Sequence, residues 1–136
     1  KQAIKPTYSH CLAADFPATT IVLNHAGLPA DRSPEGLAEW RAALGRLARE
    51  PNVALKISGI GLPGRPWTVA DNGPVIRDAI SIFGVERCMF ASNFPVAGLR
   101  IGYDDLVRNV KRMVAHLDAD AQARFFWRNA AAFYRL

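Results

Sequence analysis

The chain has 136 residues, of which 50% are hydrophobic and 21% are charged, a balance typical of one globular domain. It contains no apolar run long enough for a transmembrane helix. Its two cysteines, Cys11 and Cys88, are too few and too far apart for a disulfide framework or a Cys-x-x-Cys site. We therefore expect free thiols and a cytoplasmic location. The net charge of +5 is spread singly over helical segments, which argues against a nucleic-acid partner.

The N-terminal part predicts a helix end followed by a strand. The first residues lack the apolar core of a signal peptide, and the chain does not begin with methionine, which leaves open a segment before Lys1. Residues 9–16 are predicted to be the last turns of a helix that Pro17 ends. Residues 20–24 are apolar and partly β-branched, which predicts a strand. This run ends in Asn24, and it is followed by His25 and, two residues later, by Gly27.

The middle of the chain repeats the same strand-and-helix pattern. Ser33 and Pro34 predict the N-cap and first residue of a helix that continues to about residue 50. A second strand is predicted at 53–58, then a Gly- and Pro-rich loop at 59–68 that exposes Trp67. A helix over 72–83, closed by a glycine, leads to a third strand at 87–92.

The C-terminal part is predicted to be helical. Residues 103–116 are amphipathic, and Asp118 is predicted to cap a short helix that ends near residue 126. Asn129 is predicted to cap a last helix, which carries Phe133. Phe133, like the tryptophan at position 40, is expected in the core. Strands that alternate with helices indicate an α/β fold with parallel strands.

Alternation along the strands predicts which side chains share a face. Val53, Leu55 and Ile57 form a wholly apolar face that should meet the helices. Lys56 and Ser58 then point to the opposite side, which is the interior if the sheet closes into a barrel. Other side chains expected on, and exposed at, that interior are Leu23, Ala54 and Met89.

Four segments carry recognisable motifs: TTIVLNHAG at 19–27, NVALKISG at 52–59, RCMFASNFPV at 87–96 and NAAAFY at 129–134. In this order and spacing they resemble the amidohydrolase-related TIM-barrel hydrolases, in the branch that includes sugar lactonases and pyrone-dicarboxylate lactonases. The resemblance extends from about residue 12 to the end of the chain. It implies a partial (β/α)8 barrel, made of about the last three strand–helix units and the C-terminal helices. Residues 1–136 would form this single partial domain.

The resemblance also implies the catalytic residues. His25 would be the histidine after the sixth barrel strand, and Asn93 would stand where the wider superfamily has a catalytic aspartate after the eighth. The family's His-x-His pair after the first strand is absent from this sequence. Because Asn93 is not a carboxylate, it cannot act as a general base or bind a hard metal strongly. A divalent metal such as zinc or manganese is implied for the complete barrel, with His25 as its ligand from this chain.

The activity that follows from the resemblance is hydrolysis of a lactone or similar ester by attack of water on a carbonyl. His25 would polarise the carbonyl or hold the metal, and Asn93 would orient water or substrate. Lys56, Ser58 and Arg65 would bind a small carboxylated or polyhydroxylated substrate, with Lys56 balancing oxyanion or carboxylate charge. The other histidines, at positions 10 and 116, are expected to be solvated.

Three other interpretations stay open. The chain could be a truncated, inactive relative, or a decarboxylase of the same superfamily, because a fold does not fix its chemistry. A Rossmann-like nucleotide domain is disfavoured, since residues 59–61 are too short a match to Gly-x-Gly-x-x-Gly. We expect the chain on its own to be inactive and to form homo-oligomers, with no membrane partner.

Overall fold

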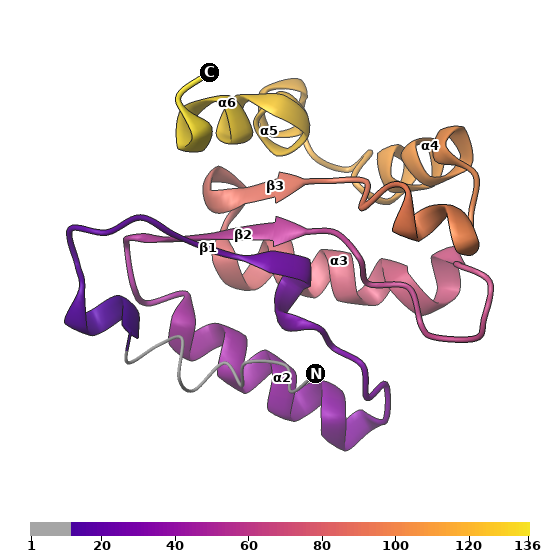
Figure 1. The fold of residues 1–136 in the computed structure, drawn as a ribbon, viewed down its shortest axis with the longest axis horizontal. Helices are drawn as coiled ribbons and strands as arrows, with labels where there is room; N and C mark the ends of the chain where they lie inside the picture. The colour runs from indigo at the N-terminus through magenta and orange to yellow at the C-terminus, as the bar shows by residue number, and fades with distance from the viewer. Residues whose placement is uncertain (1–11) are drawn as a thin grey trace.

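Three parallel strands form one sheet in sequence order (Figure 1). The computed structural model describes residues 12–136, with strands β1 (Ile21–Leu23), β2 (Val53–Ile57) and β3 (Cys88–Phe90). Helical segments connect β1 to β2 and β2 to β3, as parallel pairing requires. The predicted α/β class and the strand order are confirmed. The strands are shorter than predicted, because the chain turns away as soon as their polar ends begin.

From residue 34 onward, the α-helices that accompany the sheet are α2 (Pro34–Leu47), α3 (Val69–Phe83), α4 (Tyr103–Met113), α5 (Ala119–Ala123) and α6 (Asn129–Tyr134). The Ser33 hydroxyl accepts a hydrogen bond from the Gly36 amide and caps α2, as predicted. Helix α3 begins at residue 69 rather than 72, because Thr68 caps it by accepting from the Asp71 amide. Residues 12–15 are helical, and the rest of the helix predicted at 9–16 lies outside the described residues.

Asn129 is not a helix cap, contrary to the prediction. A five-residue π-helical turn, Arg124–Arg128, joins α5 to α6 without a break, and Asn129 has helical backbone angles. Its side-chain amide donates hydrogen bonds of 2.7 Å to the carbonyl oxygens of Val85 and Cys88. Asn129 therefore fixes the start of β3 against the C-terminal helices.

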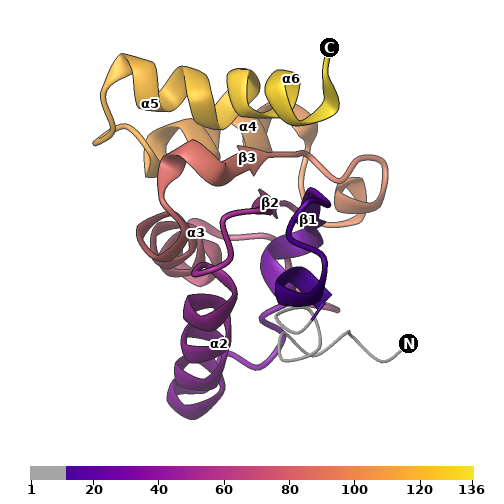
Figure 2. The ribbon, with the colours of Figure 1, turned by 90° about the vertical axis from the view of Figure 1, so that its left-hand side faces the viewer.

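The helices follow one another around the outer side of the sheet, from α2 through α3 to α4, α5 and α6 (Figure 2). The apolar face of β2 packs against them: Val53, Leu55 and Ile57 are all buried in the main hydrophobic cluster. Trp40 on α2 belongs to the same cluster, as predicted, whereas Phe133 on α6 is only half-buried. The face predicted to meet the helices is thus the one that does.

The side chains predicted to be exposed in the barrel interior are not. Leu23 pairs in register with Leu55, so it shares the helix-facing side and packs on the core. Ala54 and Met89 do lie on the other face, but they are 0% and 1% exposed. Ala54 is a small residue on the central strand, and Met89 is the register partner of Lys56 on the neighbouring strand.

No helix within residues 12–136 is long and apolar enough to cross a membrane.

Candidate active site at the strand ends

The carboxyl ends of the three strands bring their polar side chains to one place. The Nδ1 atom of His25, after β1, lies 2.8 Å from the hydroxyl oxygen of Ser58, after β2. Gly59 follows Ser58 and is next to both His25 and the side chain of Asn93, which follows β3. In parallel α/β proteins this edge of the sheet is the usual position of an active site.

The turn after β1 gives His25 its direction. Alternation along the strand would place His25 on the same side as Leu23, facing the helices. Instead the chain enters a 3-10 turn, Asn24–Gly27, in which His25 and Ala26 have positive φ angles of 56° and 49°. Trp40 on α2 anchors this turn, because its Nε1 donates a 2.8 Å hydrogen bond to the Ala26 carbonyl. The left-handed turn therefore aims the imidazole across the sheet toward Ser58.

Gly59 occupies a position where a side chain does not fit. Its φ is +57°, in the left-handed region that glycine favours. A Cβ atom there would lie 2.6 Å from His25 Nδ1 and 3.0 Å from Asn93 Nδ2. The absence of a side chain at Gly59 therefore lets the other two polar groups approach each other.

Asn93 also has a left-handed backbone, with φ of 58°, which asparagine tolerates better than most residues. Its carbonyl accepts a hydrogen bond from the Ala97 amide and closes the turn after β3. Among residues 12–136, nothing forms a hydrogen bond with its side-chain amide. That amide can consequently donate to and accept from a ligand.

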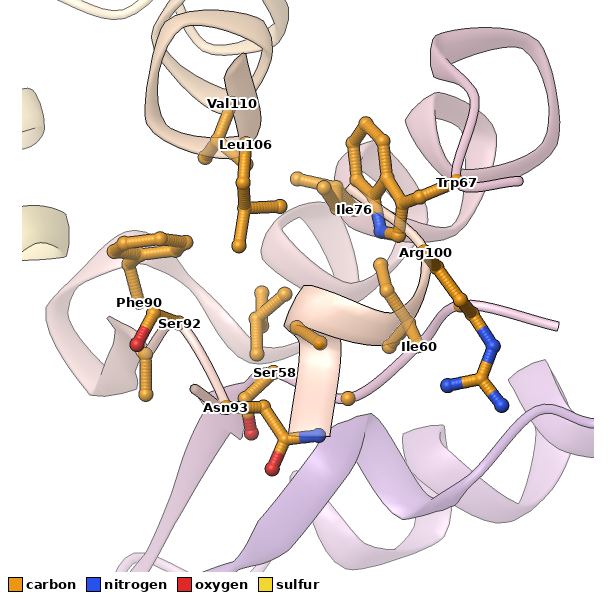
Figure 3. Close-up of a pocket in the computed structure, with 15 residues that line it drawn as sticks. Ser58, Ile60, Trp67, Ile76, Phe90, Ser92, Asn93, Arg100, Leu106 and Val110 are labelled. Atoms are coloured by element: carbon orange, nitrogen blue, oxygen red, sulfur yellow. The ribbon is translucent and has the colours of Figure 1, made fainter. Parts of the chain in front are cut away.

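A small cavity of about 30 Å³, room for about two water molecules, is lined by Ser58, Gly59 and Asn93, whereas His25 is not one of its lining residues. Figure 3 shows Ser58 and Asn93 together at one end of it, with Trp67 and Arg100 on a different side. Most of the remaining wall is apolar and includes Ile76, Phe90 and Leu106. Trp67 is 9% exposed and lines the cavity, which corrects the prediction that it is an exposed loop residue.

Arg32 holds the predicted loop 59–68 in place. Its guanidinium donates to the Ile60 carbonyl at 2.6 Å and to the Asp71 carbonyl at 3.1 Å, which joins the loop to the start of α3. Partial burial lowers the pKa of Arg32, and the nearby Asp71 charge opposes that effect. Because Ile60 lines the cavity, Arg32 shapes the site without entering it.

Two of the predicted substrate-binding residues lie away from this cluster. The Lys56 Nζ atom donates to the Tyr134 hydroxyl at 3.3 Å and lies 5.9 Å from the centre of its ring. Tyr134 ends α6, which lies toward the start of β3 rather than toward its carboxyl end (Figure 1). Arg65 is exposed and lines a separate shallow hollow with Arg100.

Arg100 is a cavity residue that the sequence analysis missed. It lies seven residues after Asn93, and its side chain lines both the cavity and the hollow beside Arg65. Within residues 12–136, its guanidinium has no hydrogen-bond or ion-pair partner. The one feature of the sequence that could have indicated Arg100 is its position in the loop after the last strand. No sequence pattern distinguishes it from the other surface arginines.

The remaining histidines and cysteines lie outside the site or outside the described residues. His116 is exposed just after α4, whereas His10 and Cys11 precede residue 12. Cys88 is a free thiol, as expected, and it lies at the start of β3, buried among core residues. Burial raises the pKa of its thiol to about 12, despite the opposing charge of Arg87.

The described residues do not by themselves make a metal centre. Across residues 12–136, no three His, Cys, Asp or Glu side chains gather closely enough to hold an ion. At the strand ends there is one imidazole, from His25, and one neutral amide, from Asn93. Tight zinc sites need at least three nitrogen, sulfur or carboxylate ligands, so these two side chains do not fit zinc alone.

The chain is similar to longer proteins. It is 43% identical over 125 residues to the uncharacterized protein y4mH of Sinorhizobium fredii, a match that covers 92% of this chain and 42% of that protein. It is 35% identical over 123 residues to an L-fucono-1,5-lactonase of Burkholderia multivorans, covering 82% of this chain and 41% of the lactonase. The chain thus spans less than half the length of these relatives.

Solved structures of amidohydrolases also superpose on this chain. A crystal structure of an amidohydrolase from Burkholderia multivorans with bound zinc superposes with a TM-score of 0.89 at 32% identity, over 97% of this chain and 49% of that one. A second crystal form with bound HEPES gives a TM-score of 0.90. The sequence profile of the amidohydrolase family matches residues 1–136. The resemblance inferred from the strand-end motifs is therefore confirmed, and the chain belongs to the amidohydrolase family.

Proposed function

We propose that this chain supplies part of the active site of a hydrolase that opens small lactones, with sugar lactones as the favoured class. The observation that supports this most is the meeting of His25, Ser58 and Asn93 at the carboxyl ends of three parallel strands. The relatives named L-fucono-1,5-lactonase, at 35% and 33% identity, favour a sugar lactone over other esters. The reaction would take place in the cytoplasm.

The proposed chemistry assigns each group a role that its position allows. His25 polarises the lactone carbonyl, and the Asn93 amide orients the attacking water or a substrate hydroxyl. The apolar wall of the cavity that Asn93 lines limits the access of bulk water there, which strengthens a hydrogen bond made by the Asn93 amide. Asn93 cannot take a proton from water, so the general base belongs to another part of the complete barrel.

Positive charge in the hollow beside the cavity favours an acidic or polyhydroxylated substrate. Arg65 is a proposed substrate-binding residue, and Arg100 beside it adds a second cation at the hollow. Ser58 forms a hydrogen bond with His25 and lines the cavity, which supports its proposed role in substrate binding. Lys56 would first have to leave Tyr134 before it could balance an oxyanion, which makes it the weakest member of the proposed set.

The test is a chimera in which this chain replaces the matching region of the Burkholderia multivorans L-fucono-1,5-lactonase. The chimera restores a protein of full relative length around the strand ends described above. Opening of L-fucono-1,5-lactone above the buffer rate supports the proposal. A chimera that folds, as judged by its circular dichroism, but opens neither this lactone nor other sugar lactones contradicts it.

A second candidate function is that of a non-catalytic family member, and one observation favours it. Asn93 stands at the strand end where a carboxylate would serve as a base, and an amide cannot replace that chemistry. In the same chimera, Asn93→Asp separates the two candidates. If activity appears only with aspartate, the natural sequence is that of an inactive relative, whereas activity with asparagine supports the lactonase.

A further inference from the structure

His25 and Ser58 form a pair whose hydrogen-bond direction can be worked out. The Ser58 hydroxyl oxygen lies 2.8 Å from His25 Nδ1, and Ser58 is 5% exposed. Ser58 follows directly on β2, so its position is set by the sheet rather than by a free loop. Its partner is held equally firmly, because the Trp40 indole anchors the turn that carries His25.

The hydroxyl proton of Ser58 has one acceptor. Within residues 12–136, His25 Nδ1 is the only atom that forms a hydrogen bond with this hydroxyl. If Nδ1 carried a proton and donated it, the Ser58 hydroxyl proton would have no acceptor among residues 12–136 and would need a water held in the cavity that Ser58 lines, which costs the entropy of fixing that water. If Ser58 donates to an unprotonated Nδ1, both groups are satisfied, and the ring proton of a neutral imidazole must lie on Nε2.

We propose that Ser58 is a positioning residue that holds His25 as the Nε2-protonated tautomer, so that His25 meets the substrate as a hydrogen-bond donor and not as a base. This inference rests on the proposed function for its substrate, a lactone carbonyl. It rests on the structure alone for the tautomer. It also separates His25 from a metal-binding role, since Nε2 has no free lone pair in this tautomer.

In the proposed reaction, His25 and Asn93 therefore have different roles at the strand ends. The Nε2–H group donates to the carbonyl oxygen as negative charge develops there, and it takes no proton from the attacking water. Gly59 keeps the space between His25 and Asn93 open, so the Asn93 amide can contact the same substrate from another side. The two side chains orient and polarise, and neither acts as the base.

The tautomer is tested by nitrogen NMR of the chain labelled with ¹⁵N-histidine, at about pH 8, where a free imidazole is neutral. The His25→Gln variant assigns the His25 signals among the three histidines. We expect a protonated Nε2 and an unprotonated Nδ1 that is shifted by the Ser58 hydrogen bond. In Ser58→Ala, Nδ1 should move toward the frequency of an unbonded nitrogen, and Ser58→Thr should restore the original shift.

Three results would overturn the inference. The first is a proton on Nδ1 in the natural sequence. The second is an unchanged Nδ1 shift in Ser58→Ala, with an amide spectrum that shows a folded protein. The third is a change in the His25 signals when equimolar zinc is added. Magic-angle-spinning spectra of sedimented protein give the same shifts if the chain associates. Because no substrate is used, these outcomes are independent of whether the chimera opens lactones.

Discussion

Gly59 is the residue on which the spacing of the proposed site depends. Alanine at this position must adopt a left-handed backbone, which costs about 1–2 kcal/mol, and its Cβ would contact His25. We therefore expect Gly59→Ala to lower the free energy of unfolding by at least that amount in urea titrations. Gly45 in α2 is the matched control, because nothing lies within 4 Å of a Cβ there.

Gly45→Ala should instead raise the unfolding free energy by about 0.5–1 kcal/mol, since alanine favours a helix interior. If Gly59→Ala is as stable as the natural chain, the strand ends are not packed as closely around Gly59 as described above.

Cys88 should be chemically silent in the folded chain. Its ordinary pKa is 9.0, and burial raises the folded value to about 12, so the folded state keeps a proton that the unfolded state loses. Stability from this group is present below about pH 9 and decreases as the pH rises from 9.0 toward 12. The Cys11→Ser variant, in which Cys88 is the remaining thiol, should react with a maleimide only after urea unfolding.

Rapid labelling of folded Cys11→Ser at pH 9.0, the ordinary pKa of this thiol, would show that the start of β3 is accessible.

At the scale of elements, the 3-10 turn Asn24–Gly27 depends on a contact from α2. Trp40→Phe keeps the buried ring but removes the donor to the Ala26 carbonyl, which leaves that carbonyl unpaired. We expect a loss of about 1–3 kcal/mol in unfolding free energy and faster amide hydrogen exchange in the turn. Trp127→Phe, at a residue that is 58% exposed, should change stability by no more than about 0.5 kcal/mol.

Equal effects of the two tryptophan substitutions would mean that the indole hydrogen bond does not support the turn that carries His25.

Local signals predict the elements better than they predict the directions of the site residues. The N-caps at Ser33 and Asp118 could be identified because a cap is formed by residues a few positions apart. The direction of the His25 side chain could not be predicted in this way, because the alternation of side chains along the strand ends where the left-handed turn begins. The family motif indicated its role, but the turn geometry and the indole contact decide where the imidazole points.

At the scale of the whole molecule, the contacts of Asn129 and Lys56 that the sequence did not predict are made with residues distant in sequence. Asn129 binds carbonyls 44 and 41 positions away, and Lys56 reaches a tyrosine 78 positions away. Nothing in the local pattern distinguishes an asparagine that caps a helix from one that fixes a distant strand. The order of the three parallel strands, in contrast, follows from short connections that each contain a helix.

The sheet leaves two strand edges open among residues 12–136, because β1 and β3 each pair only with β2. Large apolar side chains beside the site are also exposed, among them Leu99 at 82% and Val96 at 54%. Open edges and apolar patches promote association. We expect sedimentation velocity to show species heavier than the 14.9 kDa chain. We also expect no lactone opening by the chain alone, with or without zinc or manganese.

A monodisperse monomer that opens lactones faster than buffer would contradict both expectations.

The most direct test of the proposed site compares two histidines in the lactonase chimera. His25→Ala should lower kcat by at least about 100-fold, because it removes a group that stabilises charge in the transition state. The same change should lower the unfolding free energy by only about 1–3 kcal/mol, since it leaves the nearly buried Ser58 hydroxyl without its partner. His116→Ala, at an exposed position outside the site, should leave both quantities unchanged. If the two variants are equally active, His25 is not part of the catalytic site.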